Sequence, residues 1–245
     1  MYLTKKKWIA AFWTIAVCSS APLQAKEAPS CPAVQQYGMS LKFQNRSAEV
    51  QALQLQAYNL ATHRLKEILQ ANPQAKNLAI VTDLDETVLD NTDVFVSDLK
   101  RCEDYTDWKS WDEWERSGQP KLIPGSLEFL KFADQQGVKI FYVSDRSEKY
   151  RSSAMRMMKQ LDLPQVESSQ ILLYGASKEQ RRQSASQDYD IVLLLGDTLH
   201  DFSAAFSNKQ SASERAEAVV QNKEKFGDRF IVLPNVSYGA WSTAE

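Results

Sequence analysis

Residues 77–91 read "NLAIVTDLDETVLDN" and join a buried strand to an acidic cluster. The aliphatic run 78–81 has the composition of a strand that is covered on both faces. It leads directly into Asp83, Asp85, Glu86 and Asp90. Because like charges this close together repel one another, the cluster requires a compensating positive charge, such as a metal ion or a lysine.

Four more short apolar runs follow, and stretches that can form helices separate them. The runs cover residues 138–143, 171–174, 191–196 and 230–234, and the helical stretches cover residues 126–136, 147–161 and 177–187. Near-continuous aliphatic strands that alternate with helices are typical of a parallel sheet built from βαβ units. We therefore expect an α/β fold with a doubly wound, Rossmann-like parallel sheet.

The rest of the chain adds segments of other kinds. Residues 26–43 have no regular period and predict an extended arm, whereas residues 47–70 place apolar side chains at helical spacing and predict one long helix. The connection 86–124 is unusually long and rich in Trp and acidic residues. We expect one domain over residues 44–245, with a core of residues 74–85 and 125–245 and a small, mostly helical second part formed by residues 44–72 and 86–124.

The first 25 residues have the layout of a secretory signal peptide, with three lysines at 5–7, the apolar run "WIAAFWTIAV" at 8–17 and small residues after it. We expect export, to the periplasm or as a secreted protein. The alternative is a signal that acylates Cys18 and yields an outer-membrane lipoprotein, but Val17 stands where that signal needs a small residue. A retained span is disfavoured because the apolar run is shorter than the ~20 residues that a membrane helix requires.

Charge and cysteine content limit the partners and the compartment. The net charge is −2, and removing residues 1–25, which hold three lysines and no acid, lowers it to −5. A negative protein is a poor match for a nucleic-acid polymer, so small molecules are the expected partners, and an oligomer is possible. Cys31 and Cys102 either pair in an oxidising compartment or stay as free thiols.

Polar residues follow the predicted strands at their carboxyl ends, where parallel sheets bind ligands. The first strand ends in Asp83-Leu84-Asp85, and because side chains alternate along a strand, both carboxylates point the same way. The later strands are followed by Ser144, Lys178, Asp197 and Asp201.

These side chains together predict a metal-dependent phosphate site. Aspartates from distant strands do not all stay ionised unless a cation lies among them, and oxygen ligands with room for water favour Mg²⁺. One aspartate could attack phosphorus and form an aspartyl phosphate, while another carries the leaving-group proton and the lysine neutralises phosphoryl oxygens.

Two simpler explanations account for less of the pattern. A calcium loop needs an acid or an amide side chain at its fifth position and glycine at its sixth, where this chain has Thr87 and Val88. Capping of a helix N-terminus accounts for Asp85 and Glu86, but not for the second acidic strand end at Asp197.

"DLDET" at 83–87 and "LDN" at 89–91, with "GDTLHDF" at 196–202, resemble the paired signature of bacterial class C nonspecific acid phosphatases, a branch of the haloacid dehalogenase superfamily. The resemblance covers most of residues 44–245, including "IPG" at 123–125 and "LPNVSYGAW" at 233–241. It implies a secreted, Mg²⁺-dependent phosphatase that hydrolyses nucleoside monophosphates and aryl phosphates. The alternatives are a phosphotransferase or narrow nucleotidase at the same site, or a non-catalytic storage or binding protein, against which the intact Asp83 argues.

The resemblance also implies roles for single residues. Asp83 would be the nucleophile and Asp85 the general acid and base. Mg²⁺ would be held by the Asp83 carboxylate, the Asp85 main-chain carbonyl and Asp197, with Asp201 as a ligand or close neighbour. Ser144 and Lys178 would bind the phosphoryl group.

The chain departs from the family pattern beside the phosphate pocket. Asp145 stands where the family usually has asparagine, and "YGAS" at 174–177 replaces a lysine-rich segment. The pocket is therefore expected to be less basic than usual. His200 lies inside "GDTLHDF" and has no assigned role.

"DWKSWDEW" at 107–114 places Trp108, Trp111 and Trp114 at i, i+3 and i+6, which is one side of a helix. On spacing alone, such residues are more often core than ligand platform. The resemblance implies that a nucleobase or aryl ring lies between a tryptophan of this insertion and Tyr238. Trp111 and Trp114 are the candidates for that tryptophan.

Overall fold

The computed structural model describes residues 31–207 and 209–242, so the expected signal peptide and Cys18 lie outside the described residues. Five strands form one sheet in the order β5-β4-β1-β6-β7. Every neighbouring pair in it runs parallel, which confirms the predicted doubly wound sheet. The strands are β1 (Leu78–Thr82), β4 (Lys139–Val143), β5 (Ile171–Leu172), β6 (Asp190–Gly196) and β7 (Phe230–Val232).

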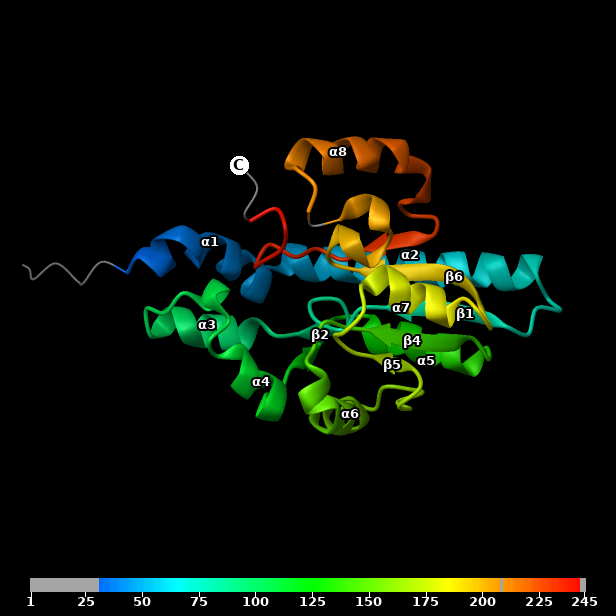
Figure 1. Ribbon diagram of the computed structural model, residues 1–245, viewed down its shortest axis with the longest axis horizontal. Helices are drawn as coiled ribbons and strands as arrows, with labels where there is room; N and C mark the ends of the chain where they lie inside the picture. Colours follow the sequence, from blue (N-terminus) through cyan, green and yellow to red (C-terminus); the bar gives the residue numbers. More distant parts are fainter. Residues whose placement is uncertain (1–30, 208, 243–245) are drawn as a thin grey trace, which may run out of the picture. The chain divides into compact units, whose positions relative to one another are not determined.

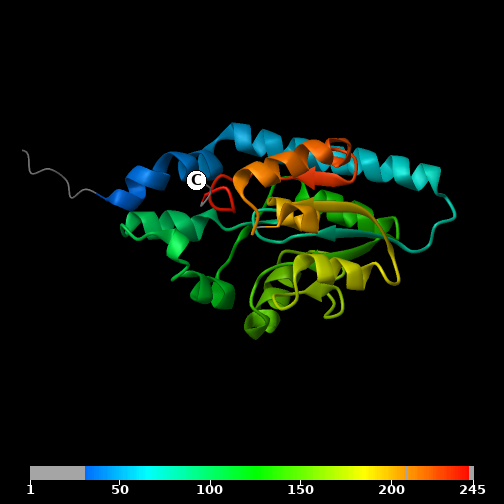
Figure 2. The ribbon, with the colours of Figure 1, turned by 45° about the horizontal axis from the view of Figure 1, so that its top comes forward.

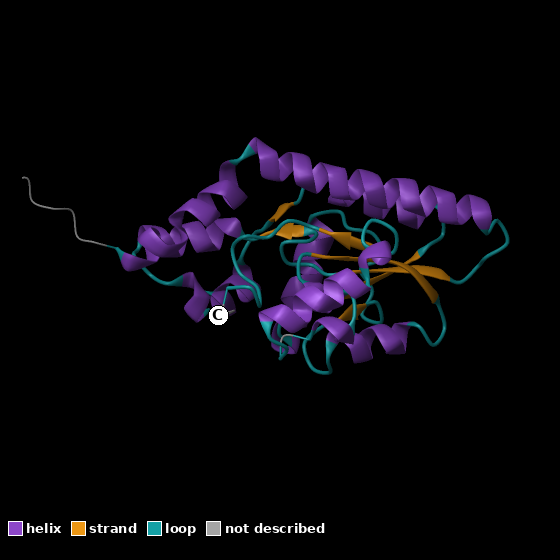
Figure 3. Cartoon of the chain, turned by 90° about the horizontal axis from the view of Figure 1, so that it is seen from above, coloured by secondary structure: helices purple, strands orange, loops and turns teal. Residues whose placement is uncertain are grey.

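β1 is the central strand and separates two apolar layers. Its residues Leu78 and Ile80 join a core cluster with α2 (Ala48–Ala71), α5 (Ser126–Gln135) and α6 (Arg151–Gln160). Ala79 and Val81 join a second cluster with α7 (Lys178–Ala185). Because successive strand residues point to opposite faces, a strand covered on both sides must be apolar throughout. Figure 3 shows α2 as the long helix that runs along one side of the sheet.

The chain between β6 and β7 packs around a small group of phenylalanines. It contains α8 (Ala212–Gln221) and the short turns η3 (Leu199–Asp201), η4 (Ala204–Phe206) and η5 (Lys223–Lys225). Phe202 stacks on Phe230 with ring centroids 5.1 Å apart, and Phe206 is fully buried beside them. This packing fixes the loop that carries Asp201.

A further apolar cluster holds the helical part together. It joins Leu41 of α1 (Pro32–Arg46), Phe95 and Leu99 of α3 (Thr92–Lys100) and Tyr105 of η1 (Tyr105–Asp107), with α4 (Trp111–Ser117) packed against it. Figures 1 and 2 show α1 and α3 side by side. A disulfide between Cys31 and Cys102 links the start of α1 to the residues after α3, so the two cysteines pair.

Two features differ from the sequence-based expectation. Residues 32–43, expected to be extended, belong to helix α1, and Pro32 opens it at a position where its missing N–H is not needed. The sequence does not predict this helix because only Ala33, Leu41 and Gln44 are buried, which is too few residues to produce a helical period of apolar side chains. The long helix α2, expected in the helical second part, instead contributes Tyr58 and Leu65 to the main core.

The two ends of the insertion 86–124 are joined by a short two-stranded sheet. β2 (Leu89–Asp90) pairs antiparallel with β3 (Lys121–Leu122). The short turn η2 (Glu148–Tyr150) follows β4 in the chain and buries none of its residues. Among residues 31–207 and 209–242, no helix has both the length and the apolar character that crossing a membrane requires.

Candidate active site

Lys178 and Asp83 lie in contact beyond the carboxyl end of β1. Lys178 is the first residue of α7, and the side chain of Ser177 caps that helix by accepting the Gln180 N–H. Lys178 Nζ lies 2.9 Å from Asp83 Oδ1 and 2.5 Å from Asp201 Oδ1. Burial lowers the pKa of Lys178, but the carboxylates of Asp201 and Asp83 outweigh it and hold that pKa above its usual value. Lys178 is therefore a buried ammonium group between two carboxylates.

Asp197 and Asp201 follow β6 and complete an acidic cluster with Asp83. One carboxylate oxygen from each of the three lies within 4.8 Å of the others. Asp197 Oδ2 accepts a hydrogen bond from Asn235 Nδ2 at 2.7 Å, which fixes its orientation. A Cβ at Gly196 would overlap the Asp201 side chain, so the glycine lets Asp201 fold back over the end of the strand.

The three carboxylates suit a divalent cation. Burial raises the pKa of Asp83 well above its ordinary value, although Lys178 acts in the opposite direction. Burial, together with the nearby Asp201 carboxylate, raises the pKa of Asp197 to about 7. A cation among these oxygens would relieve the repulsion, and an all-oxygen donor set favours Mg²⁺ over softer transition metals.

Asp85 has a different set of partners. Its carboxylate accepts hydrogen bonds from Arg146 Nη2 at 2.7 Å, Arg146 Nε at 3.0 Å and Asn91 Nδ2 at 3.0 Å. The hydroxyl of Ser144, the predicted phosphate contact, donates to Asp85 Oδ2 at 3.3 Å. Arg146 is only 3% exposed, so a buried, two-pronged ion pair sets the direction of the Asp85 carboxylate.

Glu86 links the catalytic loop to the C-terminal segment. Its backbone is in the left-handed region, with φ 54°. Its carboxylate accepts the Asn91 N–H at 2.9 Å and the Tyr238 hydroxyl. Burial raises the pKa of Glu86 to about 8; the Asp85 charge adds to the rise and the Tyr238 hydrogen bond opposes it. Tyr238 is therefore tied to the residue that directly follows Asp85.

The tryptophan that packs on Tyr238 is Trp108. The two rings meet edge-on with centroids 5.0 Å apart, and Trp108 is 41% exposed. Trp111 instead stacks on Phe95 with centroids 6.1 Å apart, and Trp114 Nε1 donates to the Asn91 side chain. Tyr238 therefore contacts Trp108 directly, whereas the indoles of Trp111 and Trp114 are engaged by Phe95 and Asn91; binding of a substrate ring between Tyr238 and Trp111 or Trp114 stays a prediction.

The three tryptophans also do not share one helix face. Trp108 has φ 57°, a left-handed conformation that ends η1, and α4 begins only at Trp111. The expectation of a single helical stripe from 108 to 114 is wrong, because a helix cannot continue through that residue.

Glu115 on α4 joins the insertion to the loop after β4. It is 6% exposed, and its carboxylate accepts the Ser147 N–H at 2.9 Å and Trp111 Nε1–H at 2.8 Å. The Trp111 ring lies 5.6 Å from the Arg146 guanidinium. The insertion therefore contacts the residue that orients Asp85.

Asp145, which replaces the family's usual asparagine, is neutralised by its neighbours. It forms an ion pair with Arg181, and its Oδ2 lies 3.5 Å from His200 Nε2. Burial raises the pKa of Asp145, but the His200 hydrogen bond and the charges of Lys178 and Arg181 hold it below its usual value. These side chains line a pocket of about 540 Å³ that adjoins Lys178.

Sequence reasoning missed several groups that hold the site. Arg146 and Asn91 lie inside "VSDR" and "LDN", directly beside residues that were identified, but their types alone assign them no role. Glu115 lies outside the quoted motifs, and Asn235 lies inside "LPNVSYGAW" but 38 positions from its partner Asp197, so only folding brings these two residues to the site. The side chains predicted from the strand ends do meet: Asp83, Lys178, Asp197 and Asp201 in one cluster, with Asp85 and Ser144 held together by hydrogen bonds.

Comparison with known proteins agrees with this geometry. A family model described as HAD superfamily, subfamily IIIB (Acid phosphatase) matches residues 3–241. The structure is similar to that of the class C acid phosphatase from Bacillus anthracis, with a TM-score of 0.80 and 35% identity over 86% of this chain and 89% of that chain. A structure of the class C acid phosphatase from Bacillus anthracis with tungstate bound gives a TM-score of 0.81 and 36% identity over 88% and 90%. Because the family model spans nearly the whole chain and the site is intact, this chain belongs to the acid phosphatases of subfamily IIIB in the HAD superfamily.

Proposed function

We propose that this acid phosphatase is an exported, Mg²⁺-dependent phosphomonoesterase that acts through an aspartyl phosphate on Asp83. The observation that supports it most directly is the buried contact between Asp83 and Lys178, with carboxylates of Asp197 and Asp201 in the same cluster. A carboxylate held there can attack phosphorus while Lys178 neutralises charge on the phosphoryl oxygens.

The proposed reaction has two steps. First, an Asp83 oxygen bonds to phosphorus, the bond from phosphorus to the leaving-group oxygen breaks, and Asp85 gives that oxygen a proton. Second, water attacks phosphorus and gives a proton to Asp85, the bond to Asp83 breaks, and inorganic phosphate leaves. Arg146 and Ser144 keep the Asp85 carboxylate oriented for both proton transfers.

The metal would be held by Asp83, Asp197, Asp201 and the main-chain carbonyl of Asp85. When bound, Mg²⁺ supplies positive charge to the phosphoryl group and helps to align it for attack. Lys178 already shares its single positive charge with the carboxylates of Asp83 and Asp201. That charge does not also neutralise a dianionic phosphate, so the proposal requires the metal as well.

Substrate preference follows from the leaving group, because the contacts to the phosphoryl group are the same for every monoester. We propose that a nucleobase or aryl ring stacks beside Tyr238, on the exposed Trp108, where each aromatic partner contributes roughly 1–3 kcal/mol. In this proposal Trp111 and Trp114 support the site without stacking on the substrate. Trp111 stacks on Phe95, and Trp114 donates a hydrogen bond to Asn91. The expected substrates are nucleoside monophosphates and aryl phosphates, with aliphatic phosphates poorer.

Export and small-molecule partners are also part of the proposal. The Cys31–Cys102 disulfide fits an oxidising compartment such as the periplasm or the medium. The negative charge of the chain without residues 1–25 disfavours nucleic-acid polymers. Acylation at Cys18 would instead make the protein an outer-membrane lipoprotein, and mass spectrometry of the exported protein separates the two.

The metal and the nucleophile can be tested together. Hydrolysis of adenosine monophosphate, p-nitrophenyl phosphate and glycerol phosphate is measured with Mg²⁺, after chelation, and after Mg²⁺ is restored. We expect chelation to abolish turnover and Mg²⁺ to restore it, and the first two substrates to exceed the third in kcat/KM. Asp83→Asn should remove activity and leave the fold intact, because an amide keeps the shape but does not attack phosphorus. Full activity in chelator, or near-normal turnover by Asp83→Asn, would contradict the proposal.

A further inference from the structure

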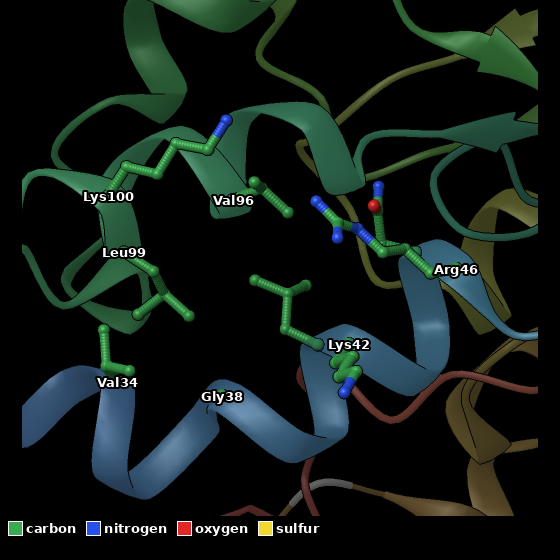
Figure 4. A pocket seen from close by; sticks show the side chains of 9 residues that line it. Val34, Gly38, Lys42, Arg46, Val96, Leu99 and Lys100 are labelled. Atoms are coloured by element: carbon green, nitrogen blue, oxygen red, sulfur yellow. The ribbon is translucent and has the colours of Figure 1, made fainter.

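Helices α1 and α3 enclose an apolar groove of about 280 Å³ outside the active site (Figure 4). Its lining includes Gly38 and the aliphatic side chains of Val34, Leu41, Val96 and Leu99. Leu41 and Leu99 are buried, whereas Val34 is 44% exposed. The groove has room at Gly38 because that residue lacks a side chain: a Cβ there would meet only Val34 Cγ1, at 3.5 Å.

Two links between the helices stand at opposite ends of this groove. At one end, the disulfide joins Cys31, one turn before Val34, to Cys102. At the other end, Asn45 Nδ2 donates to Thr92 Oγ1 at 2.8 Å. Since both ends are tied, the helices are held at a set spacing, and the groove is a built feature of the fold.

Three cations border the groove, and no acidic residue lines it. They are Lys42, Arg46 and Lys100. Within residues 31–207 and 209–242, none of the three has an ion-pair partner, whereas the neighbouring Arg101 is paired with Asp98. Figure 4 places Arg46 at the end of the groove opposite Val34. The groove therefore has an apolar lining, with Lys42 and Arg46 toward one end and Lys100 beside Leu99 toward the other.

We propose that this groove binds a single-chain anionic amphiphile of the fatty-acid class. The acyl chain lies against Leu41, Leu99 and Val34, and the carboxylate meets Arg46 and Lys42. At 1.5 Å per helical residue, positions 34 and 46 are about 18 Å apart, a span that suits an extended acyl chain of medium length. The chain's own N-terminal segment is a poor occupant because the proposed export removes residues 1–25 as a signal peptide.

The test is direct titration of the protein with dodecanoate below its aggregation concentration. We expect saturable binding of one molecule per chain, with an affinity that falls about fourfold for each methylene removed, as burial of CH₂ groups predicts. Dodecanol should bind more weakly than dodecanoate. Lys42→Gln and Arg46→Gln should each weaken dodecanoate binding by up to about fivefold, since each removes one partly exposed charge.

A filled groove provides the decisive variant. Gly38→Leu places a side chain into the space at a helical position without positive φ, and should weaken dodecanoate binding at least tenfold. Ala48→Leu adds the same group at an exposed position of α2 and should leave binding unchanged. Both variants should hydrolyse p-nitrophenyl phosphate like the wild type, which shows that they are folded.

Several outcomes would overturn the proposal. These are no saturable binding of dodecanoate, equal affinity in Gly38→Leu and wild type, and equal affinity for dodecanol and dodecanoate. Binding only to anionic vesicles would assign the groove to a membrane surface. A dimer that Gly38→Leu dissociates would assign it to a second copy of the chain. Either of these results also rejects the amphiphile site.

Discussion

Asp83 and Asp85 lie two positions apart, yet their carboxylates meet different neighbours. Asp83 faces Lys178 and the carboxylates of Asp197 and Asp201, whereas Asp85 is fixed by Arg146 and Asn91. An identical side chain therefore serves a different purpose because of what surrounds it. A nucleophile that attacks phosphorus needs a cation close to the phosphoryl oxygens. A side chain that transfers a proton needs a fixed orientation toward the group that receives it.

Arg146→Lys tests whether the Asp85 carboxylate must be oriented by a planar, two-pronged donor. Lysine keeps the charge but loses the bidentate contact, so we expect kcat to fall about 100-fold, as for other small misplacements of a catalytic group. KM should change little, and the acidic limb of the pH–rate profile should shift. Steady-state kinetics from pH 4 to 8 measure all three. Arg116→Lys, at an exposed arginine that is paired with Glu113, is the matched control. Equal losses in both variants would indicate a general loss of stability.

Asp145 contributes stability that depends on pH. Its folded-state pKa is depressed, so the contribution is present above the usual aspartate pKa of about 3.9 and is lost as pH falls through the lower folded value. We expect wild type to melt at a higher temperature than Asp145→Asn at pH 6, and the difference to shrink below about pH 4. Thermal melts across this range provide the measurement. A difference that stays constant with pH would assign the effect to shape alone.

At the scale of elements, α4 connects the insertion to the α/β core. Its Glu115 side chain accepts a hydrogen bond from the loop after β4 and another from Trp111. The Trp111 ring in turn packs against the guanidinium of Arg146. The aromatic cluster beside it holds Tyr238 next to Glu86. The substrate contacts and the proton transfer that we propose for the insertion and for Asp85 would therefore both depend on α4.

Glu115→Ala should loosen this helix. The change leaves the Ser147 N–H and the Trp111 indole N–H without their buried acceptor, which lowers the free energy of unfolding by about 2–4 kcal/mol. It should also raise KM for adenosine monophosphate more than for glycerol phosphate. Urea denaturation and steady-state kinetics test both statements. Glu113→Ala removes an exposed acid from the same helix and should change neither quantity. If the two variants behave alike, the proposed link between α4 and the core is wrong.

At the scale of the whole molecule, the disulfide is the one covalent link between α1 and the insertion in the described residues. Cys31 and Cys102 are 71 positions apart, so their bond constrains a long loop of the unfolded chain. We expect Cys102→Ser to lower the free energy of unfolding by about 2–4 kcal/mol, and a reductant to lower it by a similar amount in the wild type only. Chemical denaturation with and without reductant measures this. Identical stability of oxidised wild type and variant would contradict it.

The sheet was predictable from the sequence because its strands are short aliphatic runs whose only stable place is a layer covered on both sides. The acids at the strand ends were predictable for the same reason, since strand ends of a parallel sheet meet at one edge. Helix α1 was not, because few of its residues are buried. The direct contact of Trp108 with Tyr238 was not, because a left-handed Trp108 breaks the helical spacing from which the three tryptophans were placed on one face.

The strand order also determines when the active site comes into existence during translation. β1 is the first strand made, but it ends up between β4 and β6, and Lys178 and Asp197 come later in the chain. At the ribosome's rate of about 5–20 residues per second, Asp83 precedes Asp197 by roughly 5–25 s. Throughout that interval the nascent chain holds the proposed nucleophile without Asp197 and Asp201, so under the proposed mechanism any polypeptide that ends before residue 197 is catalytically silent.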